Sequence, residues 1–185
     1  MNGSAVPAPV LEVEVKARIP PGWDPKVLEG LASLEGVEQQ EDAYFAHPAR
    51  DFGATDEALR LRRVDDRAEL TYKGPRIDTT TKTRREVTTD VGGFERTRDI
   101  LLALEFSEVA RVRKRRTIWR TGRIEIAVDD VDGLGRYVEV EALAGDTEDP
   151  ARLREEVLGF LRKMGLAVTE RRSYLELLLD QQRGG

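Results

Sequence analysis

The sequence predicts an α+β domain built on an eight-stranded antiparallel β-barrel with helices packed on its outside. About eight segments alternate polar and apolar residues with the period of a β-strand, and three or four helical segments lie between them. A sheet of that many strands loses its exposed edges when it closes, which favours a closed or nearly closed barrel.

The clearest strand is the first, which reads LEVEVK over residues 11–16. Side chains alternate between the two faces of a strand, so Glu12, Glu14 and Lys16 lie together on one face. Taken alone, such a face is more often simply exposed to water. A binding site becomes the better explanation if later strands carry complementary charges on the same face.

Composition narrows the class of protein. The chain has 185 residues, of which 39% are hydrophobic and 35% are charged, and these values fit one globular domain. A net charge of −5 gives no reason to expect nucleic-acid binding. The sequence has no cysteine, which excludes disulfides and fits a cytoplasmic protein, and no apolar run reaches membrane length. We expect a soluble protein with a flexible N-terminus (1–9), one domain (10–180) and a flexible tail (181–185).

A helix, a strand and a long connection are predicted after the first strand. Asp24 and Pro25 predict the start of a helix that ends at Gly36. Val37–Phe45 is predicted as a strand. The connection His47–Glu57 contains the only histidine of the chain, which we interpret as a loop residue rather than a ligand or a base.

Three extended segments come next, and each carries cations on one face. The first two are joined by a short turn at residues 65–67. The polar faces hold Arg60 and Arg62 in Ala58–Val64, then Glu69, Thr71 and Lys73, and then Lys82, Arg84 and Glu86 in Lys82–Asp90.

The second half of the chain repeats this pattern and adds carboxylates. Helices are predicted over Phe94–Phe106, Asp149–Met164 and the short segment Tyr174–Leu179. The polar faces of the three strands between them hold Lys114 and Arg116 in Val109–Trp119, Asp129 in Arg123–Val131, and Glu139 with Glu141 in Arg136–Leu143. The last strand therefore pairs two carboxylates, as the first strand does.

So many interior charges need partners, because removing each ion from water costs several kcal/mol. Arginine and lysine suit phosphate oxygens, and clustered carboxylates suit hard divalent cations that also bind phosphates. We therefore expect a triphosphate with metal ions; the predicted metal ligands are Glu12, Glu14, Glu139 and Glu141, with Asp129 and Glu86 as additions. The alternative is a network of ion pairs that only fills the barrel, which is disfavoured because buried ion pairs stabilise a fold weakly.

Several blocks of the sequence resemble a known family when they are taken in order. They are the ExExK start at Glu12, the strand ALRLR from Ala58, the strand of Lys73, the KxR pair at Lys114, and VDDVDGLGRYVEVE ending at Glu141. Together they resemble the CYTH superfamily, or triphosphate tunnel metalloenzymes, over Val10–Leu179. That superfamily includes class IV adenylyl cyclases, thiamine triphosphatases and inorganic triphosphatases. The stretch Tyr44–Arg62 looks most like the class IV cyclase branch.

The resemblance implies an eight-stranded tunnel that holds Mg²⁺ or Mn²⁺ at the acidic strands. The matching triphosphate-binding residues are Lys16, Arg60, Arg62, Lys73, Lys82, Arg84, Lys114 and Arg116, where Arg84 and Arg85 compete for one position. The expected catalytic residues are Lys16, Arg62, Lys73 and Asp129. Arg171, Arg172 and Tyr174 are candidates to close one end of the tunnel.

Two reactions fit such a tunnel. The resemblance favours a cyclase, in which ATP gives cyclic AMP and pyrophosphate. The alternative is a triphosphatase acting on inorganic, thiamine or nucleoside triphosphate, and a third reading is a non-catalytic sensor of triphosphates or polyphosphate. The expected partner is thus a small-molecule triphosphate such as ATP, tripolyphosphate or thiamine triphosphate, without nucleic acid or membrane. The class IV cyclases that this chain resembles can be dimeric, so a homodimer is compatible with it.

Overall fold

The computed structural model describes residues 11–76, 84–144 and 149–184, and at the ends of these ranges, including Glu12 and Arg84, only the backbone is described. The predicted flexible segment 1–9 and the predicted phosphate-binding Lys82 lie outside the described residues. No helix in the described part of the chain is long and apolar enough to span a membrane.

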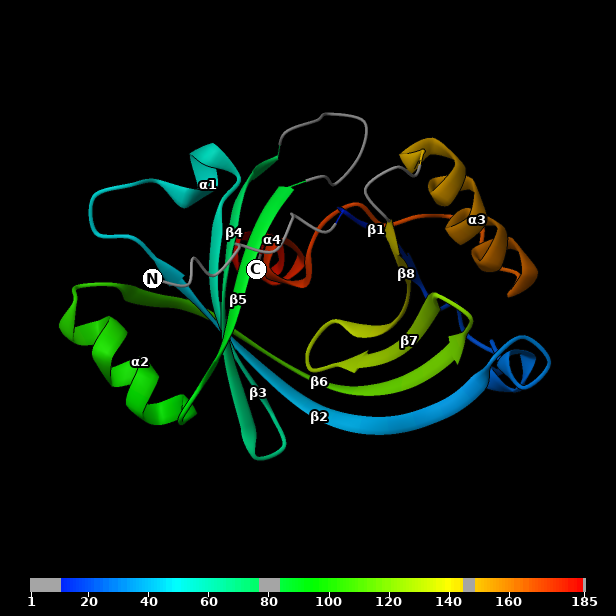
Figure 1. Cartoon of the computed structure of the whole chain (residues 1–185), viewed down its shortest axis with the longest axis horizontal. Helices are drawn as coiled ribbons and strands as arrows, with labels where there is room; N and C mark the ends of the chain where they lie inside the picture. The colour runs from blue at the N-terminus through cyan, green and yellow to red at the C-terminus, as the bar shows by residue number, and fades with distance from the viewer. Residues whose placement is uncertain (1–10, 77–83, 145–148, 185) are drawn as a thin grey trace, which may run out of the picture.

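Eight antiparallel strands form one strongly curled sheet (Figure 1). The strands are β1 (Leu11–Arg18), β2 (Ser33–Ala46), β3 (Ala58–Val64), β4 (Arg67–Arg76), β5 (Arg84–Val91), β6 (Ser107–Thr121), β7 (Ile124–Val131) and β8 (Gly135–Ala144). Their order across the sheet is β1-β8-β7-β6-β2-β3-β4-β5. The prediction of an eight-stranded antiparallel sheet is confirmed. Within the described residues, β1 and β5 are the edges and do not pair with each other, so the barrel is curled rather than closed by hydrogen bonds.

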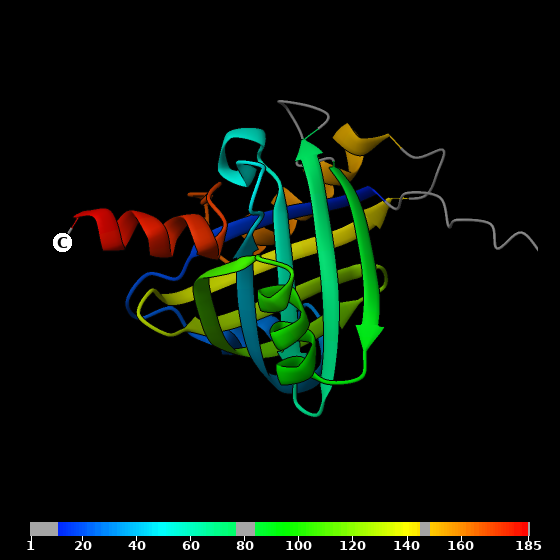
Figure 2. The same ribbon diagram turned by 90° about the vertical axis from the view of Figure 1, so that its left-hand side faces the viewer.

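The long strands β2 and β6 form an antiparallel ribbon in the middle of the sheet. They pair with each other from Ser33 opposite Arg120 to Ala46 opposite Ser107. One half of this ribbon extends through β7 and the other half extends through β3, because β6 pairs with β7 over 114–121 and β2 pairs with β3 over 40–45. Figure 2 shows the curled sheet after a quarter turn. The interior charges therefore come from strands on both sides of one ribbon.

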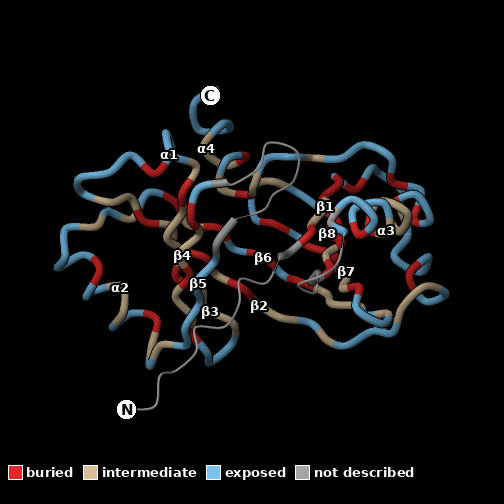
Figure 3. The backbone as a smooth tube through the Cα atoms, turned by 45° about the horizontal axis from the view of Figure 1, so that its top comes forward, coloured by how far each residue is buried: buried red, intermediate tan, exposed pale blue. Residues whose placement is uncertain are grey.

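Two helices cover the outer face of the sheet. Helix α3 (Pro150–Lys163) packs Leu153, Val157 and Leu161 on β1 and β8, and its N-cap is Asp149, as the sequence predicted. Helix α2 (Phe94–Ala103) contacts β3, β4 and β6. In Figure 3 the buried residues follow the strands and the exposed ones lie at the periphery. Apolar burial on the convex side thus leaves the concave face for polar side chains.

One helix differs from the predicted arrangement. Helix α4 (Tyr174–Gly184) packs Tyr174 and Leu177 against Val112 and Tyr137, which lie on the concave face. It also runs through residues 181–184, beyond the end that the sequence suggested. This helix therefore borders the charged interior instead of the outer core.

The helix predicted from Asp24 to Gly36 is wrong. Only a four-residue 3₁₀ helix, η1 (Pro25–Leu28), forms, with Asp24 accepting a hydrogen bond from the amide of Lys26. Ser33 already begins β2, and Leu34, which lies inside the predicted helix, is 56% exposed. Pairing with β6 outweighs the weak helical preference of this segment, which Gly30 lowers further. In the connection before β3, a single turn, α1 (Phe52–Thr55), forms within the predicted irregular stretch.

Candidate active site

The interior of the sheet places predicted cations directly opposite acids on neighbouring strands. The backbone register sets Lys16 against Glu139, Arg116 against Asp129, Arg62 against Asp42, and Lys73 against Glu86. Facing residues on adjacent strands have Cβ atoms about 5 Å apart, so opposite charges at these positions attract. The charges that the sequence predicted for one interior face are thus brought together by the strand pairing.

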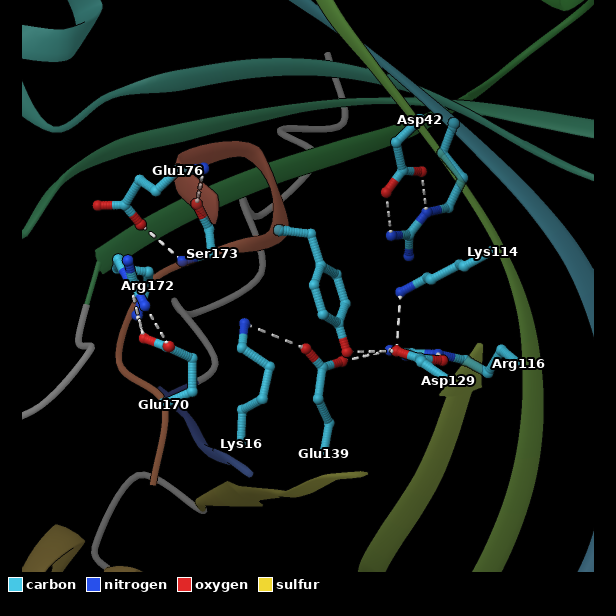
Figure 4. A network of polar contacts seen from close by, with 12 residues as sticks. Lys16, Asp42, Lys114, Arg116, Asp129, Glu139, Glu170, Arg172, Ser173 and Glu176 are labelled. Carbon is cyan, nitrogen blue, oxygen red and sulfur yellow. Dashed lines mark hydrogen bonds and ion pairs between the residues drawn. The ribbon is translucent and has the colours of Figure 1, made fainter. Parts of the chain in front are cut away.

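Arg116 is the centre of the larger cluster (Figure 4). Its Nε and Nη2 donate to the two carboxylate oxygens of Asp129 at 2.8 and 2.6 Å, and Nη2 also pairs with Glu139. Lys114 Nζ lies 3.3 Å from Asp129 Oδ2, and Lys16 Nζ lies 3.6 Å from Glu139 Oε1. All five residues are buried. Three predicted cradle cations, one predicted metal ligand and one predicted catalytic acid therefore form one network.

Burial shifts the protonation behaviour of this cluster. Burial alone would raise the pKa of Glu139, but the charges of Arg116, Lys114 and Lys16 bring that pKa well below its usual range. Burial also lowers the pKa of Lys114 to about 8, helped by the nearby charge of Arg116 and opposed by the two acids. Lys114 can therefore gain or lose its proton near neutral pH.

Tyr174 enters this cluster from helix α4. Its hydroxyl donates to Asp129 Oδ2 at 2.8 Å, and its ring centre lies 4.2 Å from Lys16 Nζ and 5.0 Å from Lys114 Nζ. Burial, followed by the charge of Glu139, raises the pKa of Tyr174 well above its usual value, so the hydroxyl stays a neutral donor. The other two predicted closing residues, Arg171 and Arg172, are exposed.

A capping box fixes the start of helix α4 and with it the position of Tyr174. The amide of Ser173 donates to Glu176 Oε2 at 2.6 Å, and the amide of Glu176 donates to Ser173 Oγ at 3.1 Å. The segment before it is tied to β1, because the amide of Glu170 donates to the carbonyl of Lys16 at 2.7 Å. Arg172 pairs with Glu170 and Asp180 at the surface.

A second cluster lies on β2, β3 and β4. Arg62 holds Asp42 with two hydrogen bonds of 2.6 and 2.7 Å. Burial would raise the pKa of Asp42, but Arg62, with Arg60 and Lys114, lowers it well below its usual range. The sequence interpretation missed Asp42. The signal was present, since residues 38, 40, 42 and 44 are all polar and alternate with the outward-facing residues of the same strand.

Arg60 is less neutralised than Arg62. Its Nη2 is 3.3 Å from Thr71 Oγ1 and 3.7 Å from Glu69, while its Nε is buried with no acceptor in the described part of the chain. Lys73 pairs with Glu86 at 2.7 Å, and both side chains are partly exposed. Arg84 begins β5, and its side chain is not described.

The predicted metal ligands fall on adjacent strands. Glu14 of β1 and Glu125 of β7 both lie directly opposite Glu141 of β8, which makes a row of three carboxylates. Glu125 was not predicted as a ligand. Such oxygen donors fit Mg²⁺ or Mn²⁺. Among the residues described, no three acidic side chains are yet close enough to hold a metal ion, and Glu139, predicted as a ligand, is occupied by Arg116 and Lys16. The donor types and their register fit a metal, although these side chains would have to converge.

A hollow of about 420 Å³ opens at the middle of the ribbon, and it differs from the cationic interior. Most of its lining is outward-facing and mixes both signs of charge; the lining residues are Gln39, Gln40, Glu41, Arg63, Asp65, Arg113, Lys114, Arg115, Asp130 and Asp132. The hollow is therefore a poorer match to a triphosphate than the clusters around Arg116 and Arg62. Lys114 and Gln40 contribute both to the lining of the hollow and to the interior face of the sheet.

Sequence comparisons place these features in a family. A sequence model of the CYTH domain matches residues 11–174. A Methanocaldococcus jannaschii protein named "putative adenylate cyclase" is 39% identical over 174 residues, covering 91% of this chain and 98% of the relative. The Aeromonas hydrophila adenylate cyclase CyaB is 24% identical over 143 residues, covering 75% of this chain and 72% of the relative.

Solved structures share the fold. The PH1819 protein of Pyrococcus horikoshii matches with a TM-score of 0.84 and 36% identity, over 92% of this chain and 99% of its own. A Hippeastrum protein matches with a TM-score of 0.70 and 17% identity, over 93% of this chain and 96% of its own. The latter is described as a "putative adenylyl cyclase" with a dominant triphosphatase activity.

Proposed function

This chain belongs to the CYTH family, and we propose that it is a divalent-metal-dependent enzyme that binds a triphosphate on the concave face of its sheet. One observation carries the proposal. Cations from four strands, β1, β3, β4 and β6, share one interior face with a row of carboxylates at its β1–β8–β7 end. A triphosphate complements the cations, and a divalent cation would complement the carboxylate row.

The favoured reaction is cyclisation of ATP. The 3′-oxygen of the ribose forms a bond to the α-phosphorus, the bond from that phosphorus to the pyrophosphate oxygen breaks, and the proton of the hydroxyl passes to a base. Support comes from the Methanocaldococcus jannaschii relative named "putative adenylate cyclase", which matches 91% of this chain. A bound divalent cation would offset the negative charge that develops on the phosphates.

The residues of this chain would bind and orient the phosphates. Asp129 fixes the guanidinium of Arg116, and Asp42 fixes that of Arg62, so these two cations are oriented before a ligand arrives. The buried Nε–H of Arg60 has no acceptor among the described residues and could donate to an oxygen of the ligand. Lys114, with its pKa near 8, can be protonated beside a polyanion or accept a proton while it is neutral.

A triphosphatase is the second candidate. In that reaction water forms the bond to the terminal phosphorus, and the remaining diphosphate leaves. It is supported by the Hippeastrum protein of the same fold, which is described as having a dominant triphosphatase activity. Both reactions need the same phosphate cradle and differ in which phosphorus faces the nucleophile.

Product identification separates the two. Purified protein is incubated with ATP, tripolyphosphate or thiamine triphosphate, each with Mg²⁺ or Mn²⁺. Cyclic AMP with pyrophosphate supports the cyclase, and orthophosphate without a cyclic product supports the triphosphatase. Binding without turnover of any of the three would contradict an enzymatic function and support a triphosphate sensor. Glu14→Gln is the matched variant, since it removes a carboxylate from the proposed metal row and should abolish the metal-dependent turnover.

A further inference from the structure

Gln40 has a hydrogen-bonding group that finds no partner in the described part of the chain. It lies on β2 directly opposite Lys114, on the interior face, and is only 6% exposed. Its Nε2 donates to Glu38 Oε2 at 2.7 Å. Its Oε1 is buried and meets no donor within the described residues. Buried acceptors without a partner are uncommon and call for an explanation.

The orientation of this amide follows from its neighbour. Were the oxygen and nitrogen exchanged, the amide oxygen would face the Glu38 carboxylate, and two acceptors would meet. The observed orientation, with nitrogen toward Glu38 and oxygen unpaired, is therefore the favourable one. The free group of Gln40 is thus an acceptor rather than a donor.

A second unpaired group lies on the same face of the neighbouring strand, with the opposite character. Arg60 of β3 has a buried Nε–H that meets no acceptor in the described part of the chain. An ionised phosphate chain offers only acceptors, so it can satisfy Arg60 but cannot satisfy Gln40. Gln40 requires a ligand group that carries hydrogen.

We infer that Gln40 accepts a hydrogen bond from the nucleoside part of the substrate and makes the site select nucleoside triphosphates over inorganic tripolyphosphate. The donor would be an O–H or N–H of the nucleoside, a ribose hydroxyl or an exocyclic amine. The inference rests on the proposed binding of a triphosphate to the interior. It fits the position of Gln40, because the facing Lys114 would contact a phosphate while Gln40 meets the group attached to the phosphate chain.

Two other donors could reach the same oxygen and are separated by the test. At pH 7.5 the terminal phosphate of ATP is largely ionised, since the second pKa of a phosphate monoester is about 6. A protonated phosphate oxygen on tripolyphosphate would make Gln40→Met weaken the binding of that ligand as well. A metal-bound water would accompany every triphosphate equally. Only a nucleoside donor makes the effect of Gln40 depend on which triphosphate is bound.

The experiment compares Gln40→Met with Gln39→Met. Methionine keeps the length of the side chain and removes the amide. Gln39 is the neighbouring residue on the same strand and is exposed on the opposite face, so it is the matched control. Dissociation constants for ATP and for tripolyphosphate are measured by calorimetry with Ca²⁺ as the divalent cation, and recovered ligand is checked to be intact. Circular dichroism melts verify that both variants fold.

Gln40→Met should weaken ATP binding by about fivefold to tenfold, the loss expected for one neutral hydrogen bond, and should change tripolyphosphate binding less than twofold. Gln39→Met should change neither. An equal loss for both ligands, or no loss for ATP, overturns the inference while leaving triphosphate binding itself in place. If the unaltered protein binds neither ligand, the proposed function fails and the inference fails with it.

Changing the ligand gives the same test without altering the protein. The probes are 2′-deoxy-ATP, 3′-deoxy-ATP and purine riboside triphosphate, which lacks the exocyclic amine. One of them should bind the unaltered protein about fivefold to tenfold more weakly than ATP and should be insensitive to Gln40→Met, as a double-mutant cycle requires. If all three probes lose affinity in Gln40→Met as ATP does, no single nucleoside donor meets Gln40 and the inference is wrong.

Discussion

Arg62 of β3 and Asp42 of β2 lie directly opposite each other on adjacent strands and form two hydrogen bonds, of 2.6 and 2.7 Å, on the concave face. Both side chains are largely buried, with 14% and 3% exposure. Asp42, on the adjacent strand, thus fixes the orientation of the Arg62 guanidinium, which belongs to the proposed phosphate cradle. The strand register therefore places this cation beside an acid that holds it in position before a ligand binds.

Removing the acid of this pair should destabilise the fold. Asp42→Asn leaves Arg62 buried without a full counter-charge, and breaking a pair of this kind costs about 3 kcal/mol. Urea unfolding should show this loss. Asp130→Asn, an exposed acid on the outer face of β7, should change the free energy of unfolding by less than about 0.5 kcal/mol. Equal stability of the two variants would mean that the Arg62–Asp42 pair contributes nothing measurable.

Triphosphate affinity should depend on pH through Lys114. The pKa of this lysine is lowered to about 8, so the group is mostly charged below pH 8 and mostly neutral above it. A polyanion binds the charged form, so affinity for ATP should fall as pH rises from 7.5 to 9, by up to about tenfold. Calorimetric titrations of the unaltered protein and of Lys114→Met measure this dependence. If the affinity of Lys114→Met for ATP fell with pH as steeply as that of the unaltered protein, the pH dependence would come from another group.

The hydroxyl of Tyr174 should contribute a modest amount of stability. Tyr174→Phe keeps the ring beside Lys16 and Lys114 and removes only the donor to Asp129. Asp129 retains its bonds to Arg116, so the expected loss is about 1 kcal/mol, the net value of one hydrogen bond. Thermal and urea unfolding test this. A loss several times larger would show that Tyr174 is needed to keep the interior charges paired.

Glu125 should take part in metal binding, although the sequence interpretation omitted it. It lies opposite Glu141 and also accepts a hydrogen bond from Arg120. Glu125→Gln should raise the Mg²⁺ concentration needed for half-maximal turnover by about tenfold, in line with losses on altering groups around a metal. Glu35→Gln removes the other carboxylate that pairs with Arg120 and lies outside the row, so it should leave the metal dependence unchanged. If both variants raised the Mg²⁺ requirement equally, the loss of an Arg120 ion pair, rather than the loss of a metal ligand, would explain the effect.

Strand faces could be read from the sequence because the strand period is fixed. Lys114 and Arg116 point inward and Arg113 and Arg115 outward, as predicted, since alternation needs no knowledge of the partner strand. The helix expected up to Gly36 was wrong because pairing with distant β6 decided that segment. The capping signal at Asp24 and Pro25 predicted correctly only the first turn, where the 3₁₀ helix η1 forms.

Other parts of the site depend on contacts between distant segments. Asp42 becomes significant only through its pairing with Arg62, and Tyr174 only through its approach to Asp129. Alternation along residues 38–44 indicates the interior face for Asp42, but it does not identify Arg62 as the partner, because strand pairing and the packing of α4 bring these residues together. The roles of Glu12, Lys82 and Arg84 remain predictions, since their side chains lie outside the described part of the chain.

The most direct test of triphosphate binding on the concave face uses two neighbouring residues of β6. Lys114 is buried on the interior face, and Arg115 is exposed on the outer face. Calorimetric titration with ATP and Mg²⁺ at pH 7 compares Lys114→Met with Arg115→Met, which remove one positive charge each. Binding inside the sheet predicts at least about a tenfold loss of affinity for Lys114→Met and less than a twofold change for Arg115→Met. Equal losses, or a larger loss for Arg115→Met, would contradict an interior site and place the ligand on the outer surface.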